Sequence, residues 1–252
     1  MKIKRTISQN LIALNQDGAI NGHVPISAIW AFLSVITALL TNQKYIAFSN
    51  EASANQPTLE IDGQNINHQY SKTLEFEQDF QNYVTTFIHP ELKYFSLLRP
   101  FSELYIAEMF AQKAWPKYKD KFSSCNRNFT QSAEGKLFWC GECPKCAFVF
   151  LILAPFTKPA ELLNIFGKNL LADPDLKQTW LELLGKTEHK PFECVGTIEE
   201  VKQAFLLAQK YYPEVSEFEE YLDLSGDFDY KKKHEHCIPK TFQGIISLSS
   251  QI

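Results

Sequence analysis

The sequence predicts an α/β protein with an open, mainly parallel sheet flanked by helices in its first half and a mostly helical second half. Up to about residue 118, short apolar runs alternate with stretches whose apolar residues recur at helical spacing. Beyond that position, helical patterns follow one another around a group of closely spaced cysteines. Alternating strands and helices are typical of a parallel sheet, because parallel strands need crossover connections. We therefore expect an α/β region at 1–118 and a helical region at 119–252.

The first predicted unit is a helix followed by a strand. Pro25 suits the first turn of a helix, where its missing N–H costs nothing, and we expect this helix to run to about Thr41. Its bulky residues recur at helical spacing, which predicts that they pack on a core: Ile29, Trp30, Leu33, Ile36 and Leu40. A strand is predicted over 44–50, and a polar loop follows it.

The remaining elements follow from the same patterns. Residues 55–69 are polar and rich in turn formers, and a helix capped by Ser71 is expected to run to about residue 87. A second strand is predicted over 94–98 and a further helix over 102–115. Helices are also expected at about 143–153, 159–166, 176–184 and 198–211, with a solvated charged turn at 231–237.

Composition excludes several classes of protein. The chain has 252 residues, 45% of them hydrophobic, and a formal net charge of −4, so it lacks the basic surface with which nucleic-acid binders neutralise phosphates. The uncharged stretch 24–43 is almost long enough to span a membrane, but its proline, serines and threonines are costly in hydrocarbon. With no secretory signal apparent, we expect a cytoplasmic protein without a nucleic-acid or membrane partner.

Four of the six cysteines lie close together, at Cys125, Cys140, Cys143 and Cys146. Two residues separate each neighbouring pair among the last three, a spacing that brings several thiolates to one metal ion. We therefore predict a zinc-binding second half, in which the closed shell of four thiolates makes the zinc structural. An iron–sulfur cluster uses similar spacing, and metal-free core cysteines are a further alternative, whereas disulfides are rare in a reducing compartment.

Polar and charged residues after the two predicted strands are candidate binding residues. Ligands bind at the carboxyl ends of strands in open α/β sheets, which is where Ser49, Asn50, Glu51 and Ser53 are expected. Arg99 follows the second strand, and its guanidinium could pair with a phosphate or a carboxylate. A solvated loop and a structural salt bridge are the alternative interpretations of these residues.

Two further groups of candidates lie near helix starts and in the second half. His23 precedes a helix whose N-terminus could hold an anion, and His68 and Lys72 lie at the start of another, although all three could simply be surface residues.

The segment 189–194 places an imidazole, an ammonium, a carboxylate and a thiol within six positions. These are His189, Lys190, Glu193 and Cys194. We expect His189, Glu193 and Cys194 to include the catalytic base, with Lys190 binding an anion, while an inert buried cysteine is the alternative for Cys194.

Several longer motifs resemble one known family. They are NGHVPI at 21–26, FSNE at 48–51, NHQYSK at 67–72, LLRP at 97–100 and HKPFECVG at 189–196. Together they look like the C-terminal portion of the UDP-N-acetylmuramoyl-L-alanyl-L-glutamate epimerase family. The run WCGECPKC at 139–146 also resembles the zinc-bearing end of ATP pyrophosphatase (PP-loop) enzymes.

The resemblance implies a reaction and its partners. A member of this family would use ATP and magnesium to activate the terminal L-glutamate of a UDP-linked muramoyl dipeptide, as an acyl-adenylate, and invert its α-carbon to give D-glutamate for peptidoglycan. Activation acidifies the α-proton, which a base then removes before a proton returns on the other face. Two alternatives are another ATP pyrophosphatase-type synthase, of the deazapurine or tRNA-modifying kind, and a non-catalytic zinc-bearing binding module.

One feature of the resembled superfamily is missing from the sequence. A glycine-rich loop of the Ser-Gly-Gly-x-Asp-Ser type, which cradles ATP phosphates through backbone amides, does not occur. Region 1–118 is therefore expected to be an incomplete nucleotide- or substrate-binding region. We rank three explanations in order: the chain is a fragment, a separate N-terminal polypeptide supplies the loop, or ATP use has been lost.

Overall fold

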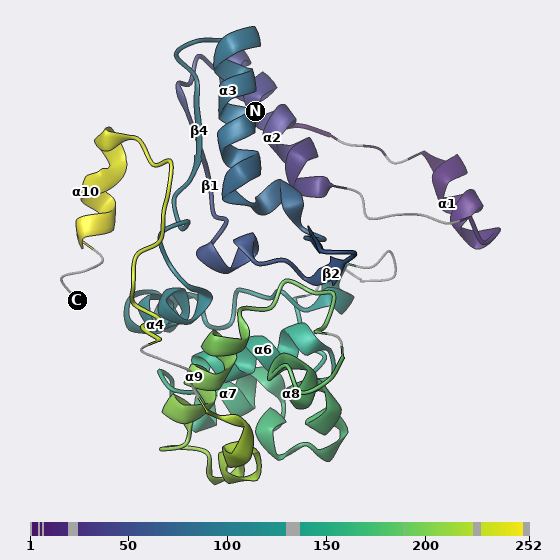
Figure 1. The fold of residues 1–252 in the computed structure, drawn as a ribbon, viewed down its shortest axis with the longest axis vertical. Coiled ribbons are helices and arrows are strands. Elements are labelled where there is room, and N and C mark those ends of the chain that lie inside the picture. Colours follow the sequence, from purple (N-terminus) through teal and green to yellow (C-terminus); the bar gives the residue numbers. More distant parts are fainter. Residues whose placement is uncertain are drawn as a thin grey trace.

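The computed structural model describes residues 2–4, 6, 8–19, 25–129, 137–188, 190–223 and 228–248, and its ribbon has two regions (Figure 1). The upper region holds two parallel strands with helices on both sides, and the lower region is helical. A short helix, α1 (Gln9–Gln16), lies apart from both.

Strands β1 (Tyr45–Phe48) and β4 (Lys93–Ser96) pair in parallel, with Ile46 opposite Tyr94 and Ala47 opposite Phe95. The parallel pairing agrees with the predicted fold class. Within the described ranges, however, this sheet contains two strands, so the structure is mostly helical and the wider open sheet that we expected is not seen.

Alternate residues of the sheet face two separate cores, as the pleat of a strand requires. Ile46 and Tyr94 pack under α2 (Ile26–Leu40) and α3 (Leu74–Phe87). Phe95 faces the opposite side, where the Phe242 ring of α10 (Lys240–Leu248) lies 5.3 Å from it, between ring centroids. The pair of strands is thus covered by helices on both faces.

The segment 55–69, which we expected to be a polar loop, contains an antiparallel hairpin. Strands β2 (Leu59–Ile61) and β3 (Gln64–Ile66) are joined by Asp62 and Gly63, which both have positive φ, at 51° and 75°. An Asp-Gly pair is the preferred sequence for such a two-residue turn, since glycine adopts the left-handed region without strain. That signal, and not the polarity around it, determines the local structure.

The helical region is built around one buried helix. Helix α6 (Pro144–Leu153) is buried along its whole length from Cys146 onwards, as expected for a helix that is apolar on every side. Four surrounding helices agree with the predicted spans to within a few residues: α4 (Glu103–Lys113), α7 (Pro159–Phe166), α8 (Lys177–Leu183) and α9 (Ile198–Ala208). The short helix α5 (Trp115–Tyr118) was not predicted. The predicted division at residue 118 stays a prediction.

Short 3₁₀ helices complete the described secondary structure. They are η1 (Ala52–Asn55), η2 (Tyr70–Lys72), η3 (Asn126–Phe129), η4 (Leu170–Ala172), η5 (Pro174–Leu176) and η6 (Pro213–Tyr221).

The packing of α2 corrects the sequence prediction. Its buried face consists of small and medium residues, Ser27, Ala31, Val35 and Ala38, which let the helix lie close to β1 and α3. Three of the bulky residues that we expected in the core, Trp30, Ile36 and Leu40, are exposed, and Ile29 and Leu33 are half-buried. In the described ranges, no helix is both long and apolar enough to cross a bilayer.

The start of α3 also differs from the prediction. Ser71 lies in η2, and Thr73 is the N-cap: its Oγ1 accepts a hydrogen bond from Phe76 N at 3.1 Å and donates to Tyr70 O at 2.8 Å.

Replacing Thr73 should therefore cost more than replacing Ser71. Thr73→Ala removes the cap and is expected to lower the free energy of unfolding by about 1 kcal/mol. Ser71→Ala, a matched control at a buried hydroxyl with no capping role, should change it less. Chemical denaturation of both variants measures the difference, and a larger loss for Ser71→Ala would contradict this capping arrangement.

Candidate active site and metal centre

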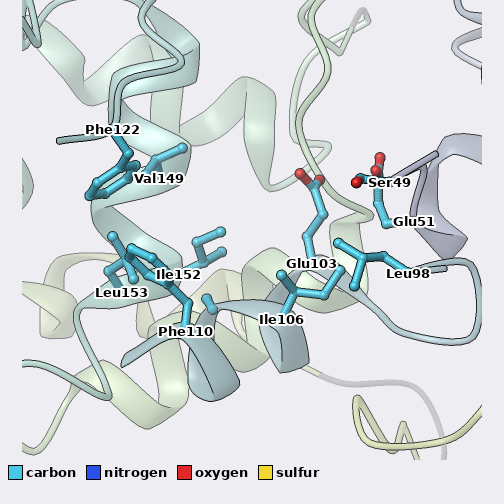
Figure 2. Close-up of a pocket in the computed structure, with 11 residues that line it drawn as sticks. Ser49, Glu51, Leu98, Glu103, Ile106, Phe110, Phe122, Val149, Ile152 and Leu153 are labelled. Carbon is cyan, nitrogen blue, oxygen red and sulfur yellow. The ribbon is translucent and has the colours of Figure 1, made fainter. Parts of the chain in front are cut away.

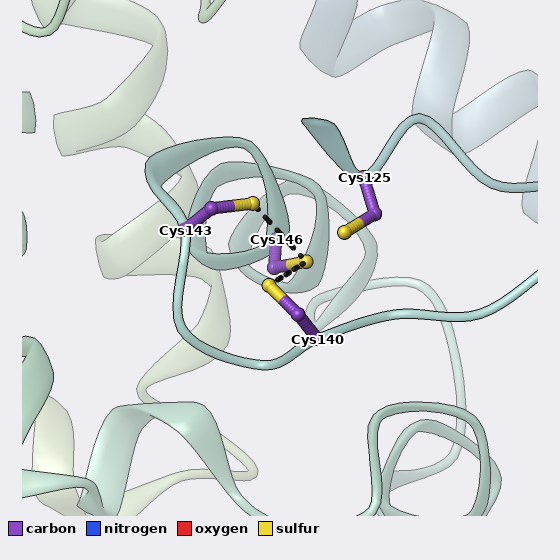
Figure 3. Close-up of side chains that lie close together, drawn as sticks. All are labelled: Cys125, Cys140, Cys143 and Cys146. Atoms are coloured by element: carbon purple, nitrogen blue, oxygen red, sulfur yellow. Dashed lines mark hydrogen bonds between the residues drawn. The ribbon is translucent and has the colours of Figure 1, made fainter. Parts of the chain in front are cut away.

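The four clustered cysteines converge on one point in the structure (Figure 3). Their sulfur atoms all lie within 4.8 Å of one another, with 3.4 Å between Cys143 and Cys146 and 3.6 Å between Cys140 and Cys146. Four thiolates about 2.3 Å from a tetrahedral zinc ion would be about 3.8 Å apart. The predicted ligand set therefore fits a zinc ion in number, type and spacing.

Local structure explains how the cysteines meet. Gly141 has φ of 69°, a left-handed conformation that turns the chain between Cys140 and Cys143. Cys143 is the N-cap of α6, so Cys146 lies in the first turn of that helix. The hydrogen-bond contact between the two thiols lowers the pKa of Cys143 to about 4, which favours the thiolate that a metal needs.

A pocket of about 290 Å³ beside this centre brings together four residues that the sequence suggested. Lys72, Cys194, His68 and Glu193 line it, and we call it the Lys72–Cys194 pocket. It also takes in Asn126, next to a zinc-ligand candidate, and residues 25–27 at the start of α2. Residues that are more than 120 positions apart therefore share one site.

The closest polar contact in this pocket joins an ammonium to a thiol. Lys72 Nζ lies 3.0 Å from Cys194 Sγ and donates to it. Burial acts to lower the pKa of Lys72, but Cys194, Glu51 and Glu103 outweigh it, and the net shift is upward. Lys72 therefore remains a cation beside the sulfur, which is the environment that activates cysteines.

The segment that carries Cys194 is held at its backbone by two lysines. Lys145 Nζ donates to Cys194 O and forms an ion pair with Glu103 at 3.6 Å. Lys190 Nζ donates to Val195 O at 3.2 Å and to Gly196 O. Burial lowers the pKa of Lys190. The Lys190 ammonium thus donates to backbone carbonyls of its own chain. Its role in binding an anion stays a prediction.

Gly196 allows this segment to pack closely on α6 and α9. A Cβ atom at this position would lie 2.7 Å from Phe148 Cζ and 2.9 Å from Glu200 Oε2. Any larger residue would displace the backbone just after Cys194.

The two other pocket residues have defined surroundings. His68 Nδ1 lies 2.5 Å from Thr58 Oγ1, and the His68 ring meets Phe192 edge-on at 5.9 Å. Burial raises the pKa of Glu193, and the nearby Cys143 raises it further. The predicted site residues His23 and His189 lie outside the described residues.

The polar loop after β1 lies at a second cavity of about 280 Å³ (Figure 2). Ser49, Glu51 and Glu103 are at one end, and the rest of the lining is apolar. Ser53 Oγ donates to Glu103 Oε2 at 3.4 Å, while Asn50 is buried and donates to Ser96 Oγ at 3.1 Å. Burial, followed by the Glu103 carboxylate, raises the pKa of Glu51 to about 7.

Arg99 is completely buried and holds three segments together. Its Nη1 donates to Glu51 O at 2.6 Å, and its Nη2 donates to Lys72 O at 2.6 Å and to Glu77 Oε2 at 3.2 Å. These are the contacts of a structural salt bridge, the alternative that the sequence left open. Its predicted binding of an anion stays a prediction.

Three charged residues of the site were not predicted from the sequence. Glu103, Lys145 and Glu200 all lie in the first turns of helices. Acidic residues are common there because they suit the positive end of the helix dipole, so the two glutamates did not stand out. Their place in the site depends on contacts with loops that are distant in the sequence, and no local pattern predicts those contacts.

The metal centre predicts a defined loss on mutation. The purified chain should contain one zinc ion per molecule, and Cys125→Ser should bring the zinc content close to zero and lower the melting temperature. Cys237→Ser, outside the cluster, should change neither. Elemental analysis measures the zinc content, and thermal unfolding measures the melting temperature. Iron in the protein, with charge-transfer absorption in the visible spectrum, would rule out zinc.

The raised pKa of Glu51 predicts a pH dependence of stability. The folded protein holds this proton up to about pH 7, whereas the unfolded chain releases it near its ordinary value of 4.5. The free energy of unfolding should therefore fall as the pH rises through about 7, and less steeply in Glu51→Gln. Urea unfolding between pH 5 and pH 8 measures both slopes. Glu91→Gln, at an exposed carboxylate, is the control, and equal slopes in Glu51→Gln and the wild type would refute the assignment.

Three curated relatives resemble this chain, and each bears the name UDP-N-acetyl-alpha-D-muramoyl-L-alanyl-L-glutamate epimerase. The relative from Xanthomonas oryzae is 45% identical over 205 residues, or 81% of this chain and 45% of the relative. Those from Micromonospora and Salinispora tropica are both 44% identical, over 82% and 78% of this chain and 46% and 42% of their own lengths. The chain thus spans less than half the length of these relatives.

Family comparisons give matches in both halves of the chain. No solved structure matches it. Residues 1–97 match the MurL N-terminal domain, and residues 121–221 match the MurL C-terminal domain. With both domains matched in order and relatives at about 45% identity, the chain belongs to the MurL family.

Proposed function

We propose that this chain takes part in the ATP-dependent epimerisation of UDP-MurNAc-L-Ala-L-Glu, converting its terminal L-glutamate to D-glutamate for peptidoglycan precursors. The names of the relatives support this substrate and reaction. Since the chain spans less than half of their length, we assign it the proton-transfer part of the site. We keep the cytoplasm as its predicted location.

The single observation that carries this proposal is the contact between Lys72 and Cys194. Removing a proton from an α-carbon requires a positioned base, and a thiol beside a fixed ammonium is a candidate for that role. The Lys72 ammonium donates a hydrogen bond to Cys194 Sγ at 3.0 Å. Lys145 fixes the Cys194 carbonyl, so the sulfur is held at one place in the pocket.

The proposed step is a proton exchange at the glutamate α-carbon. Cys194 Sγ accepts the α-proton, and the electron pair of the C–H bond stays on the substrate, delocalised into the adjacent carboxyl group. A proton then returns to the opposite face of the same carbon. Glu193, which lines the pocket, and His189 are our candidates for the donor of that proton.

ATP with magnesium would supply the activation of the carboxyl group that makes the α-proton acidic. The described residues do not fit its phosphates at the cavity beside Glu51, because no lysine or arginine lines that cavity and two glutamates face it. The role of Ser49, Asn50, Glu51 and Ser53 in binding nucleotide or substrate therefore stays a prediction. We propose that the phosphate loop comes from a further polypeptide segment.

We also propose that the cysteine cluster holds zinc and that its role is structural. Four thiolates leave no open position for substrate on a tetrahedral ion. A synthase of the ATP pyrophosphatase type and a non-catalytic zinc module would share this centre, but neither needs a Lys72–Cys194 pair in a pocket.

Loss of the thiol should abolish proton exchange. With UDP-MurNAc-L-Ala-L-Glu, ATP and magnesium in deuterium oxide, the wild type is expected to place deuterium on the glutamate α-carbon. Cys194→Ala should slow this exchange by about 10²- to 10⁴-fold, and Lys72→Met should also slow it, since each removes part of the acid–base pair.

Cys237→Ala is the control for loss of a cysteine outside the pocket, and circular dichroism checks that all variants are folded. Exchange that persists in Cys194→Ala would exclude this thiol as the base. No exchange and no D-glutamate, even with the complementary part of a relative added, would refute the proposed function itself.

A further inference from the structure

One face of the upper region is apolar and open to solvent. Helix α2 contains no charged residue, yet only one of its sides is buried. Large side chains on its other sides are exposed, among them Phe32, Ile36 and Leu40, the last to 71%. A helix that is apolar all round is normally buried on all sides, whereas the described residues cover only one side of α2.

The apolar surface continues onto the neighbouring helix. Phe32 meets Tyr83 of α3 with 6.0 Å between ring centroids, and Tyr83 meets Phe87 at 5.4 Å. Phe87 is 74% exposed. We call this surface the α2–α3 apolar face, formed by Phe32, Ile36, Leu40, Tyr83 and Phe87.

The sheet beneath these helices has one uncovered edge. The carbonyls of Lys44 and Phe48 accept hydrogen bonds from the β4 side, at Lys93 N and Leu97 N. In a parallel ladder the residues between them, Tyr45 and Ala47, point their N–H groups away from β4. Neither N–H group has a partner in the part of the chain that the structure describes.

The other edge of the sheet is closed by a side chain. Gln81 Nε2 donates to Leu92 O at 3.1 Å, and Gln81 Oε1 accepts from Tyr94 N at 2.5 Å. This amide occupies the positions that another strand would use on β4. Extension of the sheet is therefore open on the β1 side, next to α2.

We propose that the outer edge of β1 and the α2–α3 apolar face dock the polypeptide that corresponds to the additional half of the longer relatives. The match to the Xanthomonas relative covers 45% of that protein, so more than half of its sequence has no matched counterpart here. Parallel sheets are normally buried and contain more than two strands. An added strand would pair with the outer edge of β1, and its crossover helix would cover the α2–α3 apolar face.

A second copy of this chain fits the same surface less well. Two copies related by a two-fold axis would pair β1 with β1 in an antiparallel direction. A different polypeptide can add a parallel strand, in keeping with the β1–β4 pair. The docked strand would end near the loop after β1, and the docked helix would lie beside α2, whose first residues line the Lys72–Cys194 pocket.

The test uses the full 252-residue chain and a defined probe. The probe is the part of the Xanthomonas oryzae relative that lies outside its 205-residue match, co-expressed with this chain. We expect the two to co-purify as a one-to-one complex and to protect the Tyr45 and Ala47 amides from hydrogen exchange. Ile36→Glu and Leu40→Glu should weaken the complex by about tenfold or more, because each buries an unpaired charge.

Leu206→Glu on α9 is the matched control, since it places the same charge on a half-exposed helical leucine away from this face, and should leave the complex unchanged. Failure of the co-expressed pair to co-purify, or equal binding by all three variants, would overturn the proposal. So would a dimer of this chain alone that protects the β1 amides and is lost in Ile36→Glu. This assay measures binding only, so its outcome is independent of the exchange assay for the proposed function.

Discussion

The buried guanidinium of Arg99 fixes the positions on which both cavities depend. It donates to the backbone of Glu51 and of Lys72 and pairs with Glu77, and so joins the loop after β1, the turn before α3 and α3 itself. Loss of one of these partners would leave a buried charge without a hydrogen bond, which is strongly unfavourable. Arg99 therefore holds the three segments in fixed relative positions. Lys72 then faces Cys194, and Glu51 faces Glu103, as consequences of one anchored side chain.

A buried carboxylate, Glu200, lies against the segment that carries Cys194. Glu200 is almost completely buried, and its two oxygens accept from Leu104 N at 3.2 Å and Thr197 N at 2.8 Å. Burial raises the pKa of Glu200 to about 7. Such a carboxylate is costly for stability, but it aligns α4 and α9 against the segment that carries Cys194.

Sequence patterns were most informative where one local signal decides the structure. The helices around α6, the two parallel strands and the convergence of four cysteines followed from periodicity and spacing. The buried side of α2 could not be predicted, because a helix that is apolar on every side gives no pattern that shows which side faces the core. The side with the small residues Ala31 and Ala38 is buried because it allows close packing. The contact between Lys72 and Cys194 joins positions 122 residues apart, so resemblance could suggest both residues but not their pairing.

The cysteine cluster and the Lys72–Cys194 pocket are joined through the same short segments of backbone. Cys143 and Cys146 begin α6, and Lys145 between them holds the Cys194 carbonyl. Asn126, which follows Cys125, lines the pocket itself. A zinc ion that ties these loops together would therefore restrict the motion of the thiol without touching it. The proton transfer that we propose needs a sulfur held at one distance from the substrate α-carbon, and a closed thiolate shell would supply that rigidity next to a site built on loops.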